Sequence, residues 1–89
     1  MTDFRVEVQV TPRRGLLDPQ GNAVEGALRA LGFAGAQQVH VGRLIVFTLA
    51  AESQAQAVER TEAMCRQLLA NPVTEDFRVQ VRELAGAGA

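Results

Sequence analysis

The segment Leu44–Leu49 constrains the fold of this chain most strongly, because all of its residues except Thr48 are apolar. A short run rich in β-branched and aromatic residues is typical of a β-strand. Side chains alternate between the two faces of a sheet, so a strand of this kind needs apolar cover on both faces. We expect helices of the same chain to cover one face and another subunit to cover the second.

Three further segments are predicted to be strands. Phe4–Thr11 and Phe77–Arg82 alternate apolar with polar residues, which is typical of a strand with one buried face. Pro12 cannot donate a hydrogen bond to a sheet and therefore ends the first of them. Gln37–Val41 precedes the short turn Gly42-Arg43, and this arrangement predicts a β-hairpin with the apolar strand.

The first predicted helix follows Asp18, whose carboxylate can accept hydrogen bonds from the free amides of a first helical turn. Pro19 suits the first helical position, where its missing amide hydrogen is not needed. Gly32 can adopt the left-handed conformation that closes a helix. Apolar residues recur at the spacing of one helical face, at Val24, Ala27, Leu28 and Leu31.

The second predicted helix starts at Ser53–Gln56, which resembles a capping box. It ends before Asn71-Pro72, because the residue before a proline avoids helical backbone angles. Its buried stripe is expected to contain Val58, Thr61, Cys65 and Leu68, with Met64 and Leu69 at the border.

The resulting order of elements is βαββαβ. With right-handed crossovers it predicts an α+β, ferredoxin-like fold, in which a four-stranded antiparallel sheet carries both helices on one face. We expect oligomerisation to bury the open face. The 89 residues are enough for one domain with a thin core, placed at 1–84 and followed by a flexible Ala/Gly tail at 85–89.

Charge and hydropathy argue against two classes of partner. The formal net charge of −1 provides no overall attraction for nucleic acid or for an acidic membrane. The sequence shows neither an N-terminal signal nor an apolar run of about 18 residues, the usual lower length of a membrane helix. We therefore expect a soluble, cytoplasmic protein that binds neither nucleic acid nor membrane.

The residue types used in catalysis and metal binding are scarce in this chain. His40 is the single histidine and Cys65 the single cysteine, so the sequence offers no CxxC metal pair. No catalytic-triad order and no phosphate-binding glycine loop is recognisable. We expect no catalytic residue, no metal and no cofactor bound by this chain. The favoured roles are a structural or surface residue at His40 and a small buried hydrophobe at Cys65.

The connection Pro12–Gly21 is the segment most suggestive of function. Asp18-Pro19 is explained by helix initiation, but the basic pair Arg13-Arg14 and the consecutive leucines Leu16-Leu17 are not explained by local structure. One interpretation is a solvated loop. The other is a docking element, in which the arginines bind carboxylates or a phosphate of a partner and the leucines form an apolar anchor.

The same connection resembles a pattern of the PurS family. Its sequence Pro-Arg-Arg-Gly-Leu-Leu-Asp-Pro-Gln-Gly is similar to the family's Pro-Lys-x-Gly-Val-Leu-Asp-Pro-Gln-Gly. The segment 68–77, Leu-Leu-Ala-Asn-Pro-Val-Thr-Glu-Asp-Phe, is similar to the family's Leu-Leu-Ala-Asn-Pro-Val-Ile-Glu-Asp-Tyr. Arg13 and Arg43 stand where the family carries Lys, and His40 stands where it often carries Arg. The resemblance extends over residues 4–83.

The resemblance implies the small subunit of phosphoribosylformylglycinamidine (FGAM) synthase. In that complex a PurQ-like glutaminase subunit releases ammonia. A PurL-like synthetase subunit uses ATP and magnesium to convert formylglycinamide ribonucleotide to the amidine in purine biosynthesis. The small subunit is implied to be a homodimer or homotetramer that bridges the two, supports ammonia transfer and has no active site of its own.

By the same resemblance, one set of residues is implied to dock partners or to shape the loop. The set is Arg13, Arg14, Gly15, Leu16, Leu17, Asp18, Gln20 and Gly21, with Arg43 and Asn71 as weaker candidates. For Asp18, helix capping alone is an equally good explanation.

Other modules share the expected order of elements. The alternative function is an ACT-like regulatory module, which would bind an amino acid or a purine nucleotide without any partner. An RNA-recognition module needs solvent-facing aromatic residues on its central strands, and this chain offers Phe47 and little else. A ferredoxin-like metal chaperone would need the missing CxxC motif.

Overall fold

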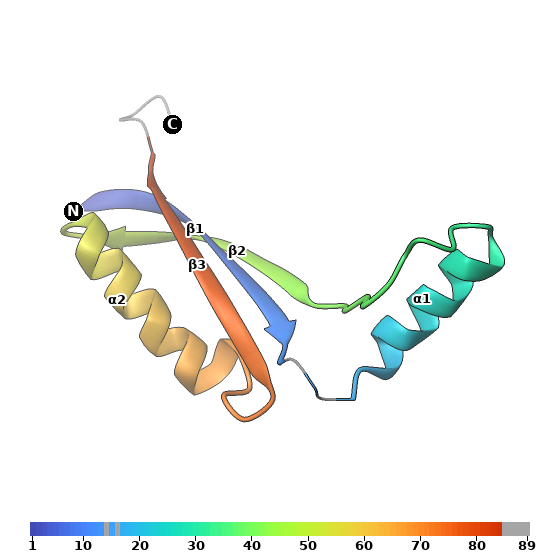
Figure 1. The fold of residues 1–89 in the computed structure, drawn as a ribbon. Helices are drawn as coiled ribbons and strands as arrows, with labels where there is room; N and C mark the ends of the chain where they lie inside the picture. Colours follow the sequence, from blue (N-terminus) through green and yellow to red (C-terminus); the bar gives the residue numbers. More distant parts are fainter. Residues whose placement is uncertain (14, 16, 85–89) are drawn as a thin grey trace.

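The computed structural model describes residues 1–13, 15 and 17–84 and contains three strands, two α-helices and one π-helical turn. The chain is flat and elongated, measuring 50 × 31 × 15 Å. In chain order the elements are β1 (Thr2–Pro12), α1 (Pro19–Ala30), β2 (Arg43–Ala51), α2 (Gln54–Met64), η1 (Cys65–Leu69) and β3 (Glu75–Glu83) (Figure 1). The strands form one antiparallel sheet in the order β2-β1-β3.

The prediction of a four-stranded, ferredoxin-like sheet is wrong, because residues 37–41 form no strand. Their backbone amides are bound by side chains rather than by a neighbouring strand. Val39 N donates to Glu25 Oε1 over 3.1 Å, and Val41 N donates to Asp18 Oδ2 over 3.1 Å. Gln38, at a φ of 55°, also interrupts an extended conformation. The ACT-like alternative rested on the four-stranded order and loses that basis.

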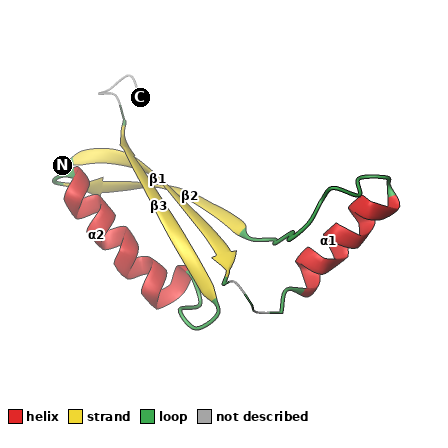
Figure 2. Ribbon diagram, viewed as in Figure 1, coloured by secondary structure: helices red, strands yellow, loops and turns green. Residues whose placement is uncertain are grey.

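The sequence analysis predicted that both helices pack on one face of the sheet, and this prediction is wrong. Only α2 lies along the sheet, whereas α1 stands apart from it at the end of two connecting segments (Figure 2). The predicted apolar stripe of α1 is therefore largely uncovered within the chain. Val24 is 39% exposed, Leu31 73%, and Phe33, just beyond the helix, 60%.

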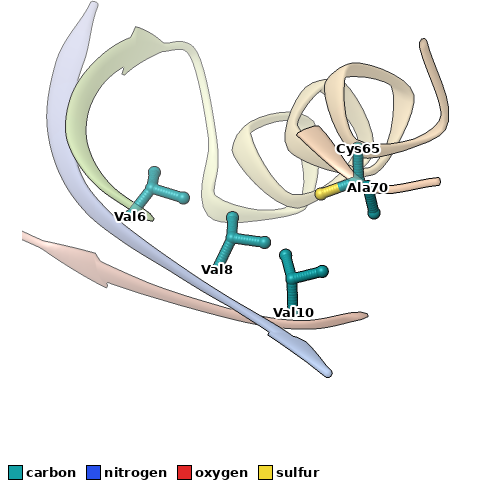
Figure 3. Packing of buried hydrophobic residues seen from close by; sticks show 5 residues of the cluster. All are labelled: Val6, Val8, Val10, Cys65 and Ala70. Atoms are coloured by element: carbon teal, nitrogen blue, oxygen red, sulfur yellow. The ribbon is translucent and has the colours of Figure 1, made fainter. Parts of the chain in front are cut away.

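The core lies between β1 and the helical segment α2–η1. Val6, Val8 and Val10 project from β1 toward Cys65 and Ala70 (Figure 3). This fits the alternation predicted for the first strand and the buried role predicted for Cys65. Half-buried residues of the outer strands pack around this cluster, namely Ile45, Phe47, Leu49, Phe77, Val79 and Val81. Such a thin core leaves little reserve of stability.

The end of the second helix differs from the prediction because the last turn is π-helical. Ala70 N donates to Cys65 O over 3.0 Å, which closes a turn one residue wider than an α-helical turn. The extra residue rotates the following side chains around the axis. As a result Leu68, predicted to be buried, is 82% exposed, and Leu69 packs on the core in its place.

The side chains of the apolar strand β2 alternate between the two faces of the sheet, as expected for a strand. Ile45, Phe47 and Leu49 face the core, whereas Leu44 and Val46 point to the open face and are 57% and 43% exposed. Within the described residues, no helix is long and apolar enough to cross a membrane.

Candidate functional site

The predicted docking residues lie in two structural groups, one at the base of α1 and one at the turn before β3. Of the residues named from the sequence, Arg14 and Leu16 lie outside the described residues. Gly15 has a φ of 80°, a left-handed conformation that favours glycine. Leu17 is 83% exposed and lines a cavity of about 410 Å³ together with Pro12, Thr74 and Glu75.

Asp18 ties together the two segments that connect α1 to the sheet, and we call this region the neck (residues 17–21 and 39–42). Asp18 Oδ1 accepts from Gly21 N over 2.9 Å, which caps α1 as predicted. Asp18 Oδ2 accepts from Val41 N and lies 3.1 Å from His40 Nδ1. The hydrogen bond from Gly21 N is the main reason that the pKa of Asp18 is lowered. His40 thus has the structural role that the sequence favoured.

Glycines allow the close approach of backbone segments in the neck. Gly21 is buried, and its Cα faces the carbonyl of Val39 so closely that any side chain would collide with it. Gly42 faces the carbonyl of Val10 on β1 in the same way. Gly21, the last glycine of the motif Pro12–Gly21, is therefore required by packing. Gln20 lies beside it on α1 and is exposed.

Arg13 holds the turn between η1 and β3. Its backbone N donates to Thr74 O over 2.9 Å, and its Nη2 donates to Pro72 O over 2.6 Å. Its Nε also lies 3.3 Å from a carboxylate oxygen of Asp76. Arg13 therefore spans the end of β1 and the turn, and it shapes this corner of the molecule.

Arg43 binds the same turn from β2. It donates to both carboxylate oxygens of Glu75, over 2.8 and 3.1 Å, and to Leu69 O over 2.7 Å. Glu75 also accepts from Asn71 N over 2.8 Å, and Asn71 Oδ1 accepts from Val73 N over 3.0 Å. The turn thus projects Val73, which is 75% exposed, from a rigid base.

The hydrogen bonds of Arg13, Asp18 and Arg43 fix the shape of the surface at the neck and at the turn before β3. The described residues contain no group of three His, Cys, Asp or Glu side chains that could hold a metal ion. Cys65 is buried, and this burial raises the pKa of its thiol and keeps it unreactive.

Comparison with known proteins agrees with the resemblance noted in the sequence. Residues 5–83 match the family model PurS, described as phosphoribosylformylglycinamidine (FGAM) synthase. The chain belongs to the PurS family. Phosphoribosylformylglycinamidine synthase subunit PurS of Synechocystis sp. is 40% identical to it, over 94% of this chain and 84% of the relative.

Solved PurS structures share the fold. PurS of Thermus thermophilus superposes with a TM-score of 0.82 at 37% identity, over 93% of this chain and 99% of that one. A chain of the PurLQS structure from Thermotoga maritima superposes with a TM-score of 0.82 at 32% identity, over 94% of this chain and 100% of that one. The three-stranded architecture is thus matched in PurS proteins over nearly their whole length.

Two residues that were not predicted from the sequence complete this PurS-family site. Glu75 is the shared partner of Arg43 and Asn71, and Glu25 binds the backbone of Val39 in the neck. Glu75 directly follows the Asn-Pro-Val-Thr turn, and a carboxylate so placed was the available signal for a turn-stabilising acceptor.

Acid is expected to weaken this PurS-family fold through Glu75. The hydrogen bond from Arg43, followed by that from Asn71, lowers the pKa of Glu75 below its ordinary value of 4.5. The stabilisation is therefore complete above that value and is lost as the pH falls through the lower pKa of the folded state. Because the pair is partly exposed, we expect Glu75→Gln to cost about 1 kcal/mol at pH 7 and less at pH 3.

Urea unfolding of both proteins at pH 7 and pH 3 checks this prediction. Glu59→Gln, on the exposed side of α2, is the control and should change the free energy of unfolding equally little at both pH values. An equal loss for Glu75→Gln at both pH values would contradict the assignment.

Proposed function

We propose that this chain is the non-catalytic small subunit of FGAM synthase, and that it joins a PurL-like synthetase subunit to a PurQ-like glutaminase subunit. The likeness to a chain of the PurLQS structure from Thermotoga maritima carries this proposal. Membership of a family named for a purine-biosynthetic enzyme supports a cytoplasmic location. ATP and magnesium are then bound by other subunits.

We further propose that the protein works as a homo-oligomer. The apolar stripe of α1 is exposed, and an isolated helix of this length is marginal in water. On the covered face of the sheet, Ile45, Phe47 and Leu49 of β2 remain only half-buried beside α2. Both surfaces are apolar and incompletely covered within the chain, so α1 of one copy can cover the strip on another copy.

The function is tested by reconstitution. Purified synthetase and glutaminase subunits from the same organism should form the amidine from glutamine only when this chain is added. A high concentration of ammonium salt should replace both glutamine and this chain, because a chain that joins the two subunits supports the transfer of ammonia from one to the other. Glutamine-dependent turnover of equal rate without the chain would exclude the proposal.

Arg13 tests the docking role of the turn. We expect Arg13→Ala to weaken assembly about tenfold, because it releases the turn that projects Val73. Arg13→Lys retains the charge and one donor nitrogen, without the fork of the guanidinium, and should have a smaller effect. Size-exclusion chromatography of the three mixed subunits, with Arg60→Ala on the exposed side of α2 as the control, measures the change. Unchanged assembly and turnover for Arg13→Ala would disprove the docking role.

A further inference from the structure

The open face of the sheet concentrates arginine side chains along β1 and β3. Arg5 lies directly opposite Arg82 in the β1–β3 register, and Arg78 lies opposite Gln9. All three arginines are exposed, on the face that points away from α2. Within residues 1–13, 15 and 17–84, none of the three forms an ion pair, whereas Arg13, Arg29 and Arg43 each do.

The fold does not need these charges. Like charges directly across an antiparallel pair destabilise it, so Arg5 and Arg82 oppose folding. Glu7 is the single carboxylate in the middle of this face. Asp3 lies near one end of β1, and Asp76, near the other end, is already matched by Arg13. The middle of the face therefore carries an excess of positive charge that its own residues do not neutralise.

The same face has a hollow and an apolar border. A cavity of about 290 Å³ is lined by Gln9, Thr11 and Arg78 of this face, and also by Phe77, whose side chain packs on the core. The side chains of Gln9, Thr11 and Arg78 can all donate hydrogen bonds to an oxygen anion. Leu44 and Val46 of β2 flank the arginines and are 57% and 43% exposed. Arginine beside exposed apolar residues is a common composition of protein–protein interfaces.

We propose that this face, which we call the arginine face (Arg5, Arg78, Arg82, Leu44 and Val46), docks a carboxylate-bearing surface of a different protein chain. This inference rests on the proposed function, in which that chain is one of the two larger subunits. A carboxylate from the partner fills the hollow beside Arg78 and a second one relieves the repulsion between Arg5 and Arg82.

Two other occupants fit the arginine face less well. A second copy packed by twofold symmetry would bring two faces with the same excess of positive charge together. Single-stranded RNA would need aromatic side chains on this face, but Phe4, Phe47 and Phe77 belong to the apolar face on the other side of the sheet.

Cross-linking locates the partner of this face. Every one of the nine basic residues of the chain is arginine, so a substituted lysine provides the single side-chain amine. With a zero-length carbodiimide reagent, Arg78→Lys and Arg82→Lys should each cross-link to Asp or Glu of a larger subunit in the assembled complex. Arg60→Lys, on the exposed side of α2, is the matched control. Cross-links to a second copy of this chain, equal cross-linking from position 60, or none from 78 and 82 would each overturn the proposal.

Charge reversal measures the contribution of the face. Arg78→Glu/Arg82→Glu should weaken assembly with the larger subunits about 30-fold or more, since truncating one partner of a buried charge pair has effects of this size. The midpoint of thermal unfolding should stay the same or rise, because Glu at position 82 faces Arg5. The control Arg60→Glu/Arg66→Glu makes the same change in charge on α2 and η1, and it should bind the larger subunits as the wild-type chain does.

The outcomes separate this inference from the function on which it rests. If the wild-type chain does not assemble with the larger subunits, the proposed function fails. If it assembles and the reversed variant assembles equally well, the arginine face alone is wrong. Binding of poly-uridylate by the wild-type chain that is lost in the reversed variant, with assembly unchanged, would assign the face to RNA instead.

Discussion

Gly42→Ala is expected to destabilise the protein by about 3 kcal/mol, at the upper end of typical overpacking effects. A Cβ atom at Gly42 would collide with the carbonyl oxygen of Val10 and lie 3.2 Å from the Cα of Thr11. Both atoms belong to the backbone of β1, the central strand, and cannot move without breaking the sheet. For a chain of this size the midpoint of thermal unfolding should fall by about 12–24 °C.

Gly26→Ala is the matched control for this experiment. Gly26 lies inside α1, and a Cβ atom built there meets nothing within 4 Å. Alanine favours a helix over glycine by about 1 kcal/mol, so the control should stabilise the protein. Urea unfolding at one protein concentration compares the variants. A Gly42→Ala variant as stable as the wild type would show that the neck does not approach β1 in the way described.

Leu31→Glu is expected to reduce self-association at least about 100-fold. Leu31 is 73% exposed in the single chain, so the fold of one copy hardly depends on this side chain. In the proposed oligomer each copy buries this leucine, and burial of one leucine is worth about 1.5–3 kcal/mol. Because a twofold contact contains two copies of Leu31, the substitution would remove this burial energy twice. The cost of burying an unpaired carboxylate would weaken the association further.

Analytical ultracentrifugation at micromolar concentration measures the effect. The wild-type protein should sediment as a dimer or tetramer, and Leu31→Glu as a monomer with unchanged far-UV circular dichroism. Asn22→Glu, an exposed position on α1 outside the apolar stripe, adds the same charge and should remain associated. A monomeric wild-type protein, or an associated Leu31→Glu variant, would contradict the assignment of α1 to the interface.

The sequence was sufficient where structure is set by neighbouring residues. The alternation in β1, the Asp18 cap and the Ser53 cap of α2 are all local patterns, and the structure contains each of them. The prediction of a strand at 37–41 was wrong because Glu25 and Asp18, which are distant in sequence, bind the amides that a strand would have used. The predicted burial of Leu68 was wrong because a π-helical turn has no clear sequence signal.

The sequence showed which residues belong to the candidate site, but not how they contact one another. The motif residues Arg13, Arg43 and Asn71 were selected from the sequence as docking candidates. The structure adds that all three are bound within the chain, at the turn before β3. Contacts between residues as far apart as 59 positions, such as Arg13 with Pro72, depend on the whole topology. The arginine face likewise exists only because β1 and β3 are neighbours.

The position of β1 in the middle of the sheet affects how the chain is made. The ribosome synthesises β1 before the two strands that flank it in the sheet. One edge of β1 stays unpaired until β2 has been made, and the other edge until β3 has been made. Until those strands have been made, the nascent polypeptide exposes a strand with alternating valines, a state that is prone to aggregation. More than half of the contacts within the chain join residues that are distant in sequence, so we expect folding to be slow and to benefit from chaperones.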